Sequence, residues 1–105
     1  MSETHQQAFH VPLEHASFPD HFPGHPVVPG ALLLQWVFDG FQSRWPELRI
    51  NKVKSIKFLT PLLPGDRCEF LYCLDRSKSA LKIRCEKNEA VIISGDLKII
   101  DEAAW

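Results

Sequence analysis

Apolar residues surround nearly the whole circumference of the segment 31–45, and this pattern is typical of a buried helix. Pro46 ends the predicted helix, because a proline removes a backbone donor that the next turn would need. Gln35, Asp39 and Gln42 form one polar stripe, since residues three and four apart share a helix face. The stripe either faces a polar spot in a pocket or is solvated at the mouth of the helix groove.

The rest of the chain has a pattern that predicts strands. Residues 8–14 can form a short strand, which Pro12 confines to a sheet edge or a strand end. After the helix, extended segments alternate with turn signals such as Pro64-Gly65-Asp66. These later strands are predicted at residues 49–59, 67–75, 79–87 and 90–100.

One early strand, one buried helix and four consecutive strands predict an α+β fold. A helix that is apolar all round can be buried only inside the curl of the antiparallel sheet. The chain of 105 residues predicts a single domain, residues 1–105. A domain of this size has little core to spare for a large cavity, so we expect a pocket formed between two copies.

Charge and composition exclude several classes of partner. The chain has 12 basic and 13 acidic residues and a net charge of -1, without a block of like charge. Binding to nucleic acid or to a membrane surface is therefore not expected. The start of the chain lacks the features of a secretory signal, and we expect a cytoplasmic protein. Its three cysteines, Cys68, Cys73 and Cys85, are expected to be free thiols in strands.

The segment 17–30 contains four prolines and two glycines, which predicts a stiff, ordered loop before the helix. It carries His21 and His25, whose spacing would suit a metal pair only on a helix, so we expect no metal. For His25 a structural role is favoured. Gly30 at the helix start can offer backbone N–H groups to the oxyanion of an acyl thioester. A histidine held nearby can act as the base that removes the α-proton.

Two stretches of sequence resemble a known family. The sequence HFPGHPVVPG at residues 21–30, followed by ALLLQ at 31–35, closely resembles the motif of bacterial 3-hydroxyacyl-ACP dehydratases of hot-dog fold. The sequence FLTPLLPGD at residues 58–66 is similar to a later strand and turn of that family. The resemblance covers the whole chain, and several of these dehydratases, including short ones, belong to aryl polyene, pigment or lipid pathways.

The resemblance implies a long buried helix wrapped by a curved antiparallel sheet, in dimers that join two sheets. The active site would lie between protomers, require no cofactor and act on a substrate carried by acyl carrier protein. The expected reaction is dehydration of a 3-hydroxyacyl thioester to the trans-2-enoyl thioester. The thioester is expected to contact residues near the helix start, namely Phe22, Pro29, Gly30 and Ala31.

The family's catalytic histidine matches His21. Its carboxylate lies fourteen positions further along, on the partner's helix, where this chain has Gln35. The family's glutamine one turn later corresponds to Asp39, so the two residue types are exchanged. Three outcomes stay open: Asp39 supplies the proton, Gln35 only orients the hydroxyl or a water while His21 makes both transfers, or a partner hot-dog subunit completes the site.

Two other functions remain open on the same fold, a thioesterase that uses Asp39 to activate water and a non-catalytic subunit of a heteromer. The acyl chain is expected beside the helix, although ordinary core is the more common role for each candidate wall residue. These wall candidates are Leu33, Trp36, Val37 and Phe38. Carrier protein docks through acidic helices, so basic residues at the pocket mouth are candidates to receive it. They are Arg44, Lys52, Lys54 and Lys57.

Overall fold

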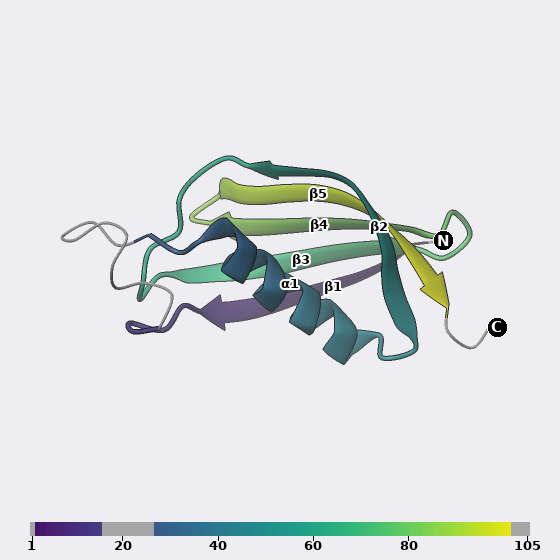
Figure 1. The fold of residues 1–105 in the computed structure, drawn as a ribbon, viewed down its shortest axis with the longest axis horizontal. Helices are drawn as coiled ribbons and strands as arrows, with labels where there is room; N and C mark the ends of the chain where they lie inside the picture. The colour runs from purple at the N-terminus through teal and green to yellow at the C-terminus, as the bar shows by residue number, and fades with distance from the viewer. Residues whose placement is uncertain (1, 16–26, 102–105) are drawn as a thin grey trace.

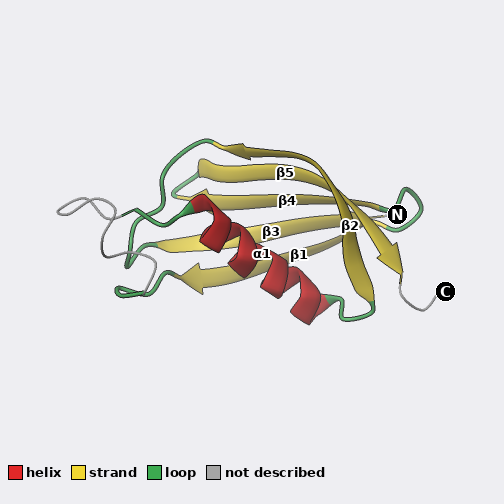
Figure 2. Cartoon of the chain, in the orientation of Figure 1, coloured by secondary structure: helices red, strands yellow, loops and turns green. Residues whose placement is uncertain are grey.

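The computed structural model describes residues 2–15 and 27–101, which form one antiparallel sheet of five strands with a single helix across one face (Figure 1). The two termini of the described chain lie toward the same end of the molecule (Figure 2). In chain order the elements are β1 (Ser2–His10), α1 (Gly30–Arg44), β2 (Leu48–Phe58), β3 (Arg67–Asp75), β4 (Ala80–Lys87) and β5 (Ala90–Asp101).

The strand order is β1-β3-β4-β5-β2, and every neighbouring pair is antiparallel. β1 and β2 flank the helix in sequence but lie at opposite edges of the sheet, so α1 crosses the face between them (Figure 1). This arrangement is the antiparallel sheet with one packed helix that the hot-dog resemblance implies. The four later strands agree with the predicted ranges to within one residue at each end.

The prediction of the first strand at residues 8–14 was wrong. β1 runs from Ser2 to His10 and ends before Pro12, which cannot donate to the ladder with β3. Its inward positions are only half-buried and include Glu3, His5 and Gln7. The hydrophobic alternation that normally reveals a strand is therefore absent from most of β1.

The helix agrees with the predicted segment 31–45 to within one residue at each end, but it is less enclosed than predicted. It has 15 residues, and the sheet buries only Leu33, Val37, Gly40 and Phe41. The prediction of a helix buried on all sides is therefore wrong for the single chain. Only the side toward the sheet is covered, and other apolar residues of α1, such as Phe38, are half-buried.

The core lies between this side of the helix and the inward residues of the central strands. In β3 every second residue from Cys68 to Leu74 is buried, as expected for a strand with one covered face. β4 continues the layer with Leu81, Ile83 and Cys85. All three cysteines are free thiols on strands, as predicted.

The turn between β4 and β5 has the conformation that a two-residue hairpin needs. Asn88 and Glu89 both have positive φ, at 49° and 67°, which matches the right-handed twist of the flanking strands. No helix in the described part of the chain has the length and apolar character needed to cross a membrane.

Candidate functional site at the helix start

The first turn of α1 presents backbone donors without a partner in the helix. Pro29 is the N-cap, and its carbonyl accepts a 3.1 Å hydrogen bond from the Leu33 N–H. The N–H groups of Gly30, Ala31 and Leu32 precede this bond, and an α-helix offers them no acceptor. No side chain in the described residues caps them, and the first turn contains no acidic residue. The positive end of the helix dipole is therefore available to a ligand oxygen.

A groove of about 400 Å³ opens beside this helix start. Most of its lining is apolar, so it can take a hydrocarbon chain next to the backbone donors. The lining residues come from the entry to α1, the end of β2, the following loop and β5: Val28, Gly30, Leu33, Phe58, Leu59, Thr60, Pro61, Leu62 and Ile92.

The Phe58 ring packs directly against Gly30. A Cβ at Gly30 would lie 2.8 Å from the Phe58 Cε1 atom, which is closer than carbon atoms approach without a shift. Phe58 is 54% exposed, so it forms a wall of the groove and is not part of the core. A glycine at the helix start therefore leaves the space that Phe58 occupies.

Backbone hydrogen bonds hold the walls of the groove together. The Val28 N–H donates to the Leu62 carbonyl at 2.8 Å, which ties the entry of the helix to the loop after β2. The Leu59 N–H donates to the Ile92 carbonyl at 2.9 Å and ties the same loop to β5. Segments far apart in sequence are thereby fixed around Gly30, as a site that positions a substrate requires.

The structure brings some of the predicted site residues together. Pro29, Gly30 and Ala31 lie at the helix start, where the loop motif meets the groove. His21 and Phe22 lie outside the described residues.

The polar stripe of the helix is separate from the groove in the single chain. Gln35 and Asp39 are exposed on α1, and neither lines the groove beside Gly30. Gln42 is half-buried, and its amide donates to the carbonyls of Trp45 at 3.4 Å and Pro46 at 3.1 Å. Gln42 therefore supports the end of the helix, while Gln35 and Asp39 are available to a partner.

The comparison with protein families matches residues 1–96 to the ApeI-like model, described as ApeI dehydratase. The chain belongs to the ApeI-like dehydratase family. The match includes the helix start, the groove and the exposed Gln35 and Asp39 of this ApeI-like chain.

Known proteins similar to this ApeI-like chain include dehydratases. A 3-hydroxyacyl-[acyl-carrier-protein] dehydratase FabZ from Campylobacter hominis is 35% identical over 97 residues, covering 82% of this chain and 63% of that protein. FabZ proteins of the same description from Aliarcobacter butzleri and Latilactobacillus sakei each match over 58% of their length. The chain thus spans less than two thirds of the length of these curated relatives.

Solved structures show the same fold. The dehydratase heterocomplex ApeI:P from Xenorhabdus doucetiae contains a chain that matches with a TM-score of 0.80 and 23% identity, covering 94% of this chain and 93% of that one. An uncharacterized protein from Erwinia carotovora subsp. atroseptica matches with a TM-score of 0.82 and 24% identity, covering 95% of this chain and 85% of that one. The sheet and helix of the ApeI-like chain are therefore shared over nearly the whole length of both structures.

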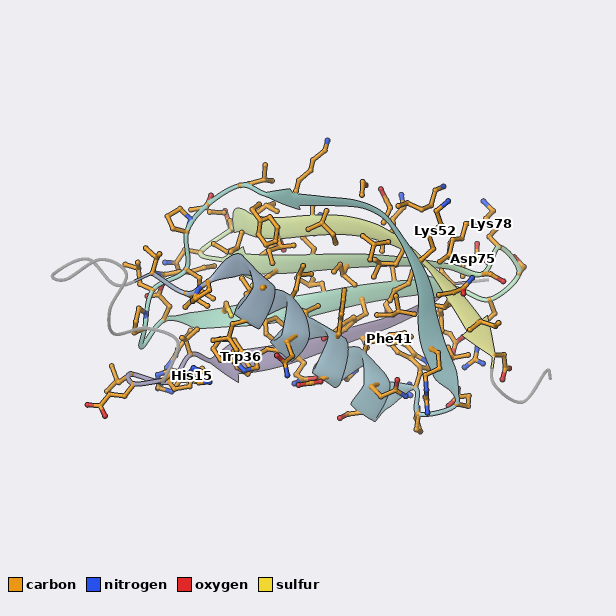
Figure 3. All side chains as sticks on the ribbon, in the orientation of Figure 1. His15, Trp36, Phe41, Lys52, Asp75 and Lys78 are labelled. Atoms are coloured by element: carbon orange, nitrogen blue, oxygen red, sulfur yellow. The ribbon has the colours of Figure 1, made fainter. Side chains whose placement is uncertain are left out.

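The predicted wall residues of the ApeI-like chain divide between two roles. Leu33 lines the groove, whereas Val37 is buried in the core against the sheet. Trp36 points toward β1, where its ring lies 5.0 Å from that of Phe9 and beside His15 (Figure 3). Phe38 is half-buried and is not among the groove residues.

The sequence interpretation missed Phe58 as a wall of the site. The signal was present, because Phe58 opens the second family-like stretch at residues 58–66. Its contact with Gly30 joins that stretch to the first one. The sequence pattern predicts where a strand begins and ends, but it does not show that the end of β2 reaches the start of α1.

Proposed function

We propose that this ApeI-like protein dehydrates a 3-hydroxyacyl thioester on acyl carrier protein to the trans-2-enoyl thioester, in fatty-acid-like or polyene lipid and pigment biosynthesis. The observation that carries this proposal is the open helix start at Gly30 beside an apolar groove, in a chain matched over residues 1–96 by a dehydratase family. The chemistry needs a place for an acyl chain next to donors for a thioester carbonyl, and the groove offers both.

In the proposed reaction, the N–H groups at Gly30 and Ala31 receive the thioester carbonyl oxygen and stabilise the negative charge that develops there. The imidazole of His21 removes a proton from the α-carbon. The electron pair of that C–H bond forms the α,β double bond, and the β-hydroxyl leaves as water after it receives a proton. Phe22 and Pro29 are proposed to border the thioester on either side.

The proton for the leaving hydroxyl is assigned to Asp39. A carboxylic acid can donate this proton, whereas the Gln35 amide cannot do so at useful cost. Gln35 lies one helical turn before Asp39 and is proposed to orient the hydroxyl or a water. The other two arrangements are that His21 makes both proton transfers and that a partner subunit supplies the acid.

The proposed assembly is a homodimer or a heterodimer with another hot-dog subunit. Its support is the position of Gln35 and Asp39, which are exposed and lie outside the groove of their own chain. A partner's groove and histidine placed against this helix would complete a site. Acyl carrier protein is the proposed substrate carrier, and the basic residues proposed to receive it are Arg44, Lys52, Lys54 and Lys57.

The test is the conversion of a 3-hydroxyacyl-carrier-protein substrate to its enoyl product by the purified chain, alone and with a second hot-dog subunit. His21→Ala is expected to abolish product formation, because no other group in this scheme removes the α-proton. His10→Ala is a matched control, since His10 is exposed on β1. Full activity of the His21→Ala variant would show that the base is assigned wrongly.

A thioesterase is the second candidate function, and the exposed carboxylate of Asp39 on the helix favours it. In that case Asp39 would activate a water molecule, and the products would be a free acid and a free thiol. Thiol release from the same substrate, without enoyl product, would replace the dehydratase proposal with this one. A chain that is folded and inactive until a second hot-dog subunit is added would instead be a completing subunit.

A further inference from the structure

The outer face of the sheet, which points away from α1, carries two neighbouring hollows. α1 is the one helix of the described residues, and it lies on the other face (Figure 1). One hollow has a volume of about 530 Å³ and the other of about 480 Å³, and Gln6 and Leu71 line both of them. These two residues are direct neighbours in the β1–β3 ladder. The hollows therefore adjoin along the direction of the strands.

The outward residues of β4 change sign from one hollow to the other. Lys82, Arg84 and Glu86 alternate with the buried residues of this strand, so their side chains point to the outer face. Glu89 follows in the turn after β4 and is exposed. Lys82 and Arg84 line the larger hollow, whereas Glu86 and Glu89 line the smaller one. β4 thus has a basic end and an acidic end on this face.

A second carboxylate adds to the acidic end. Glu69 of β3 lies directly opposite Glu86 in the β3–β4 register. Like charges in opposite positions of a ladder are unfavourable, so this pair favours a cation close by. Within the chain, Gln6 donates a hydrogen bond to Glu69, and Arg84 lies 3.4 Å from Glu86. The Arg84 side chain is 51% exposed, and such a solvated ion pair contributes little. A cation from another molecule would therefore be stabilised beside the two carboxylates.

Other charged residues of the two hollows are partly balanced. Asp96 of β5 lies opposite Lys82 in the β4–β5 register and lines the basic hollow. Lys87 lines the acidic hollow but forms a 2.8 Å ion pair with Asp66. Arg67 also lines the acidic hollow, at the start of β3. The contrast between the two ends of β4 therefore remains.

A second copy of the chain fits this pattern when it is turned about a two-fold axis. The axis lies between the two outer faces, at right angles to the strands, and crosses β4 between Arg84 and Glu86. It brings Arg84 of one copy over Glu86 of the other, and Lys82 over Glu89. In such a symmetric interface each contact occurs twice. Two sheets can pack face to face with their strands nearly aligned, about 10 Å apart.

The charges also select this orientation over the alternative one. A two-fold axis parallel to the strands would place each end of β4 over the same end of its copy. Lys82 and Arg84 would then meet cations, and Glu86 would meet a carboxylate. Because juxtaposed like charges are unfavourable, only the antiparallel orientation is complementary.

We infer that the outer face of the sheet binds a second copy of this chain, back to back, through ion pairs of Lys82 and Arg84 with Glu86 and Glu89. This pairing is separate from the assembly proposed for the active site, because none of these four residues lines the groove beside Gly30. It goes beyond the proposed function and does not depend on the reaction that the chain catalyses.

The test measures mass by sedimentation velocity for the wild-type chain and two charge variants. The acidic variant is Lys82→Glu/Arg84→Glu, and the basic variant is Glu86→Lys/Glu89→Lys. Each variant brings like charges together in the antiparallel orientation. The wild-type chain is expected to reach twice the mass of either variant at the same concentration, with pairing weakened about tenfold or more in each variant. Pairing of the wild-type chain is expected to weaken at about 1 M NaCl, because salt screens the charges.

Two controls separate this pairing from a loss of fold or a change in net charge. An equimolar mixture of the acidic and basic variants is expected to recover the doubled mass, because both ends of β4 then meet opposite charges. The variant with all four changes keeps the wild-type net charge and reverses the pattern. It is expected to pair with itself but not with the wild-type chain, and circular dichroism checks that every variant is folded.

Three results would overturn the inference. They are equal masses for the wild-type chain and both charge variants, a mixture of the variants that does not recover the doubled mass, and a four-change variant that pairs with the wild-type chain as tightly as with itself. The measurements use no substrate, so failure of the dehydratase proposal leaves their result unchanged.

Discussion

The Tyr72 hydroxyl, buried beneath the helix, donates a 2.6 Å hydrogen bond to the backbone carbonyl of Val37. Burial raises the pKa of Tyr72, and the negative charge of Asp39 raises this pKa further. The hydroxyl therefore keeps its proton and stays a donor throughout the neutral range. Gly40 lies next to this hydrogen bond and leaves room for the hydroxyl. The contact holds the middle of the helix, between Gln35 and the C-terminal end, on β3.

Gly40→Ala is expected to destabilise the fold by about 1–3 kcal/mol, the usual cost of overpacking a tight core. A Cβ at this position would collide with the Tyr72 hydroxyl and lie 3.2 Å from the Gln7 Oε1 atom. Alanine favours a helix over glycine by about 1 kcal/mol, so a net loss of stability in this variant would come from the collision. Urea unfolding followed by circular dichroism measures the difference.

The control for this prediction is the double variant Gly40→Ala/Tyr72→Phe. Removing the hydroxyl relieves the collision, so the double variant is expected to be more stable than the sum of the two single changes allows. Strictly additive losses would show that the hydroxyl is not what excludes a side chain at position 40.

The sequence predicted the helix and the last four strands because their patterns reflect burial directly. In β3, the buried positions from Cys68 to Leu74 alternate with exposed or half-buried ones, and turn signals bound this largely apolar stretch on both sides. β1 was misplaced because its inward residues, such as His5 and Gln7, are polar and only half-buried. Local patterns carry no information about a strand that is held mainly by backbone pairing with β3.

The candidate site was predicted only in part, for a related reason. Gly30 was found from the helix start and its motif, which are local features of the sequence. The contact between Phe58 and Gly30 depends on how β2 crosses the sheet, and no local pattern specifies that path. Gln35 and Asp39 are exposed, so one side of the helix is uncovered. The sequence did not predict this uncovered side, because apolar residues surround nearly the whole circumference of the segment.

Gly30→Ala is expected to lower kcat/KM for the proposed dehydration by about 10²–10³, the usual loss when an oxyanion site is disturbed. The new Cβ would displace the Phe58 ring, or the thioester carbonyl that is proposed to bind beside Gly30. Steady-state kinetics with a 3-hydroxyacyl-carrier-protein substrate measures the loss. In the double variant Gly30→Ala/Phe58→Ala, the Phe58 ring is removed and cannot collide with the new Cβ. Recovery in the double variant would assign the loss to Phe58, whereas equal rates for Gly30→Ala and wild type would contradict a carbonyl site here.

Asp39→Asn is expected to reduce kcat by about 10²–10⁴, the range that general acid catalysis contributes. The amide cannot donate the proton that the leaving hydroxyl needs. Gln35→Glu, which puts a carboxylate one turn earlier, is expected to restore part of the rate in the Asp39→Asn background. Ser43→Ala, an exposed change on the same helix, is the control for altered helix stability. Unchanged kcat in Asp39→Asn would assign the proton to His21 or to a partner subunit.

Asp66→Asn is expected to destabilise the fold at neutral pH by about 1–2 kcal/mol and to have a smaller effect in acid. Burial alone would raise the pKa of Asp66, but hydrogen bonds from Lys87 and from the Leu63 N–H, together with the charge of Lys87, lower it below its ordinary value of 3.8. A lowered pKa means that the ionised carboxylate stabilises the folded state. This stability is fully present above about pH 3.8 and is lost as the pH falls through the lower folded value. Urea unfolding of wild type and variant from about pH 7 to pH 2 measures the difference, with the exposed change Glu14→Gln as control. A difference between Asp66→Asn and wild type that stays constant to the lowest pH would show that the Asp66 charge does not support the fold.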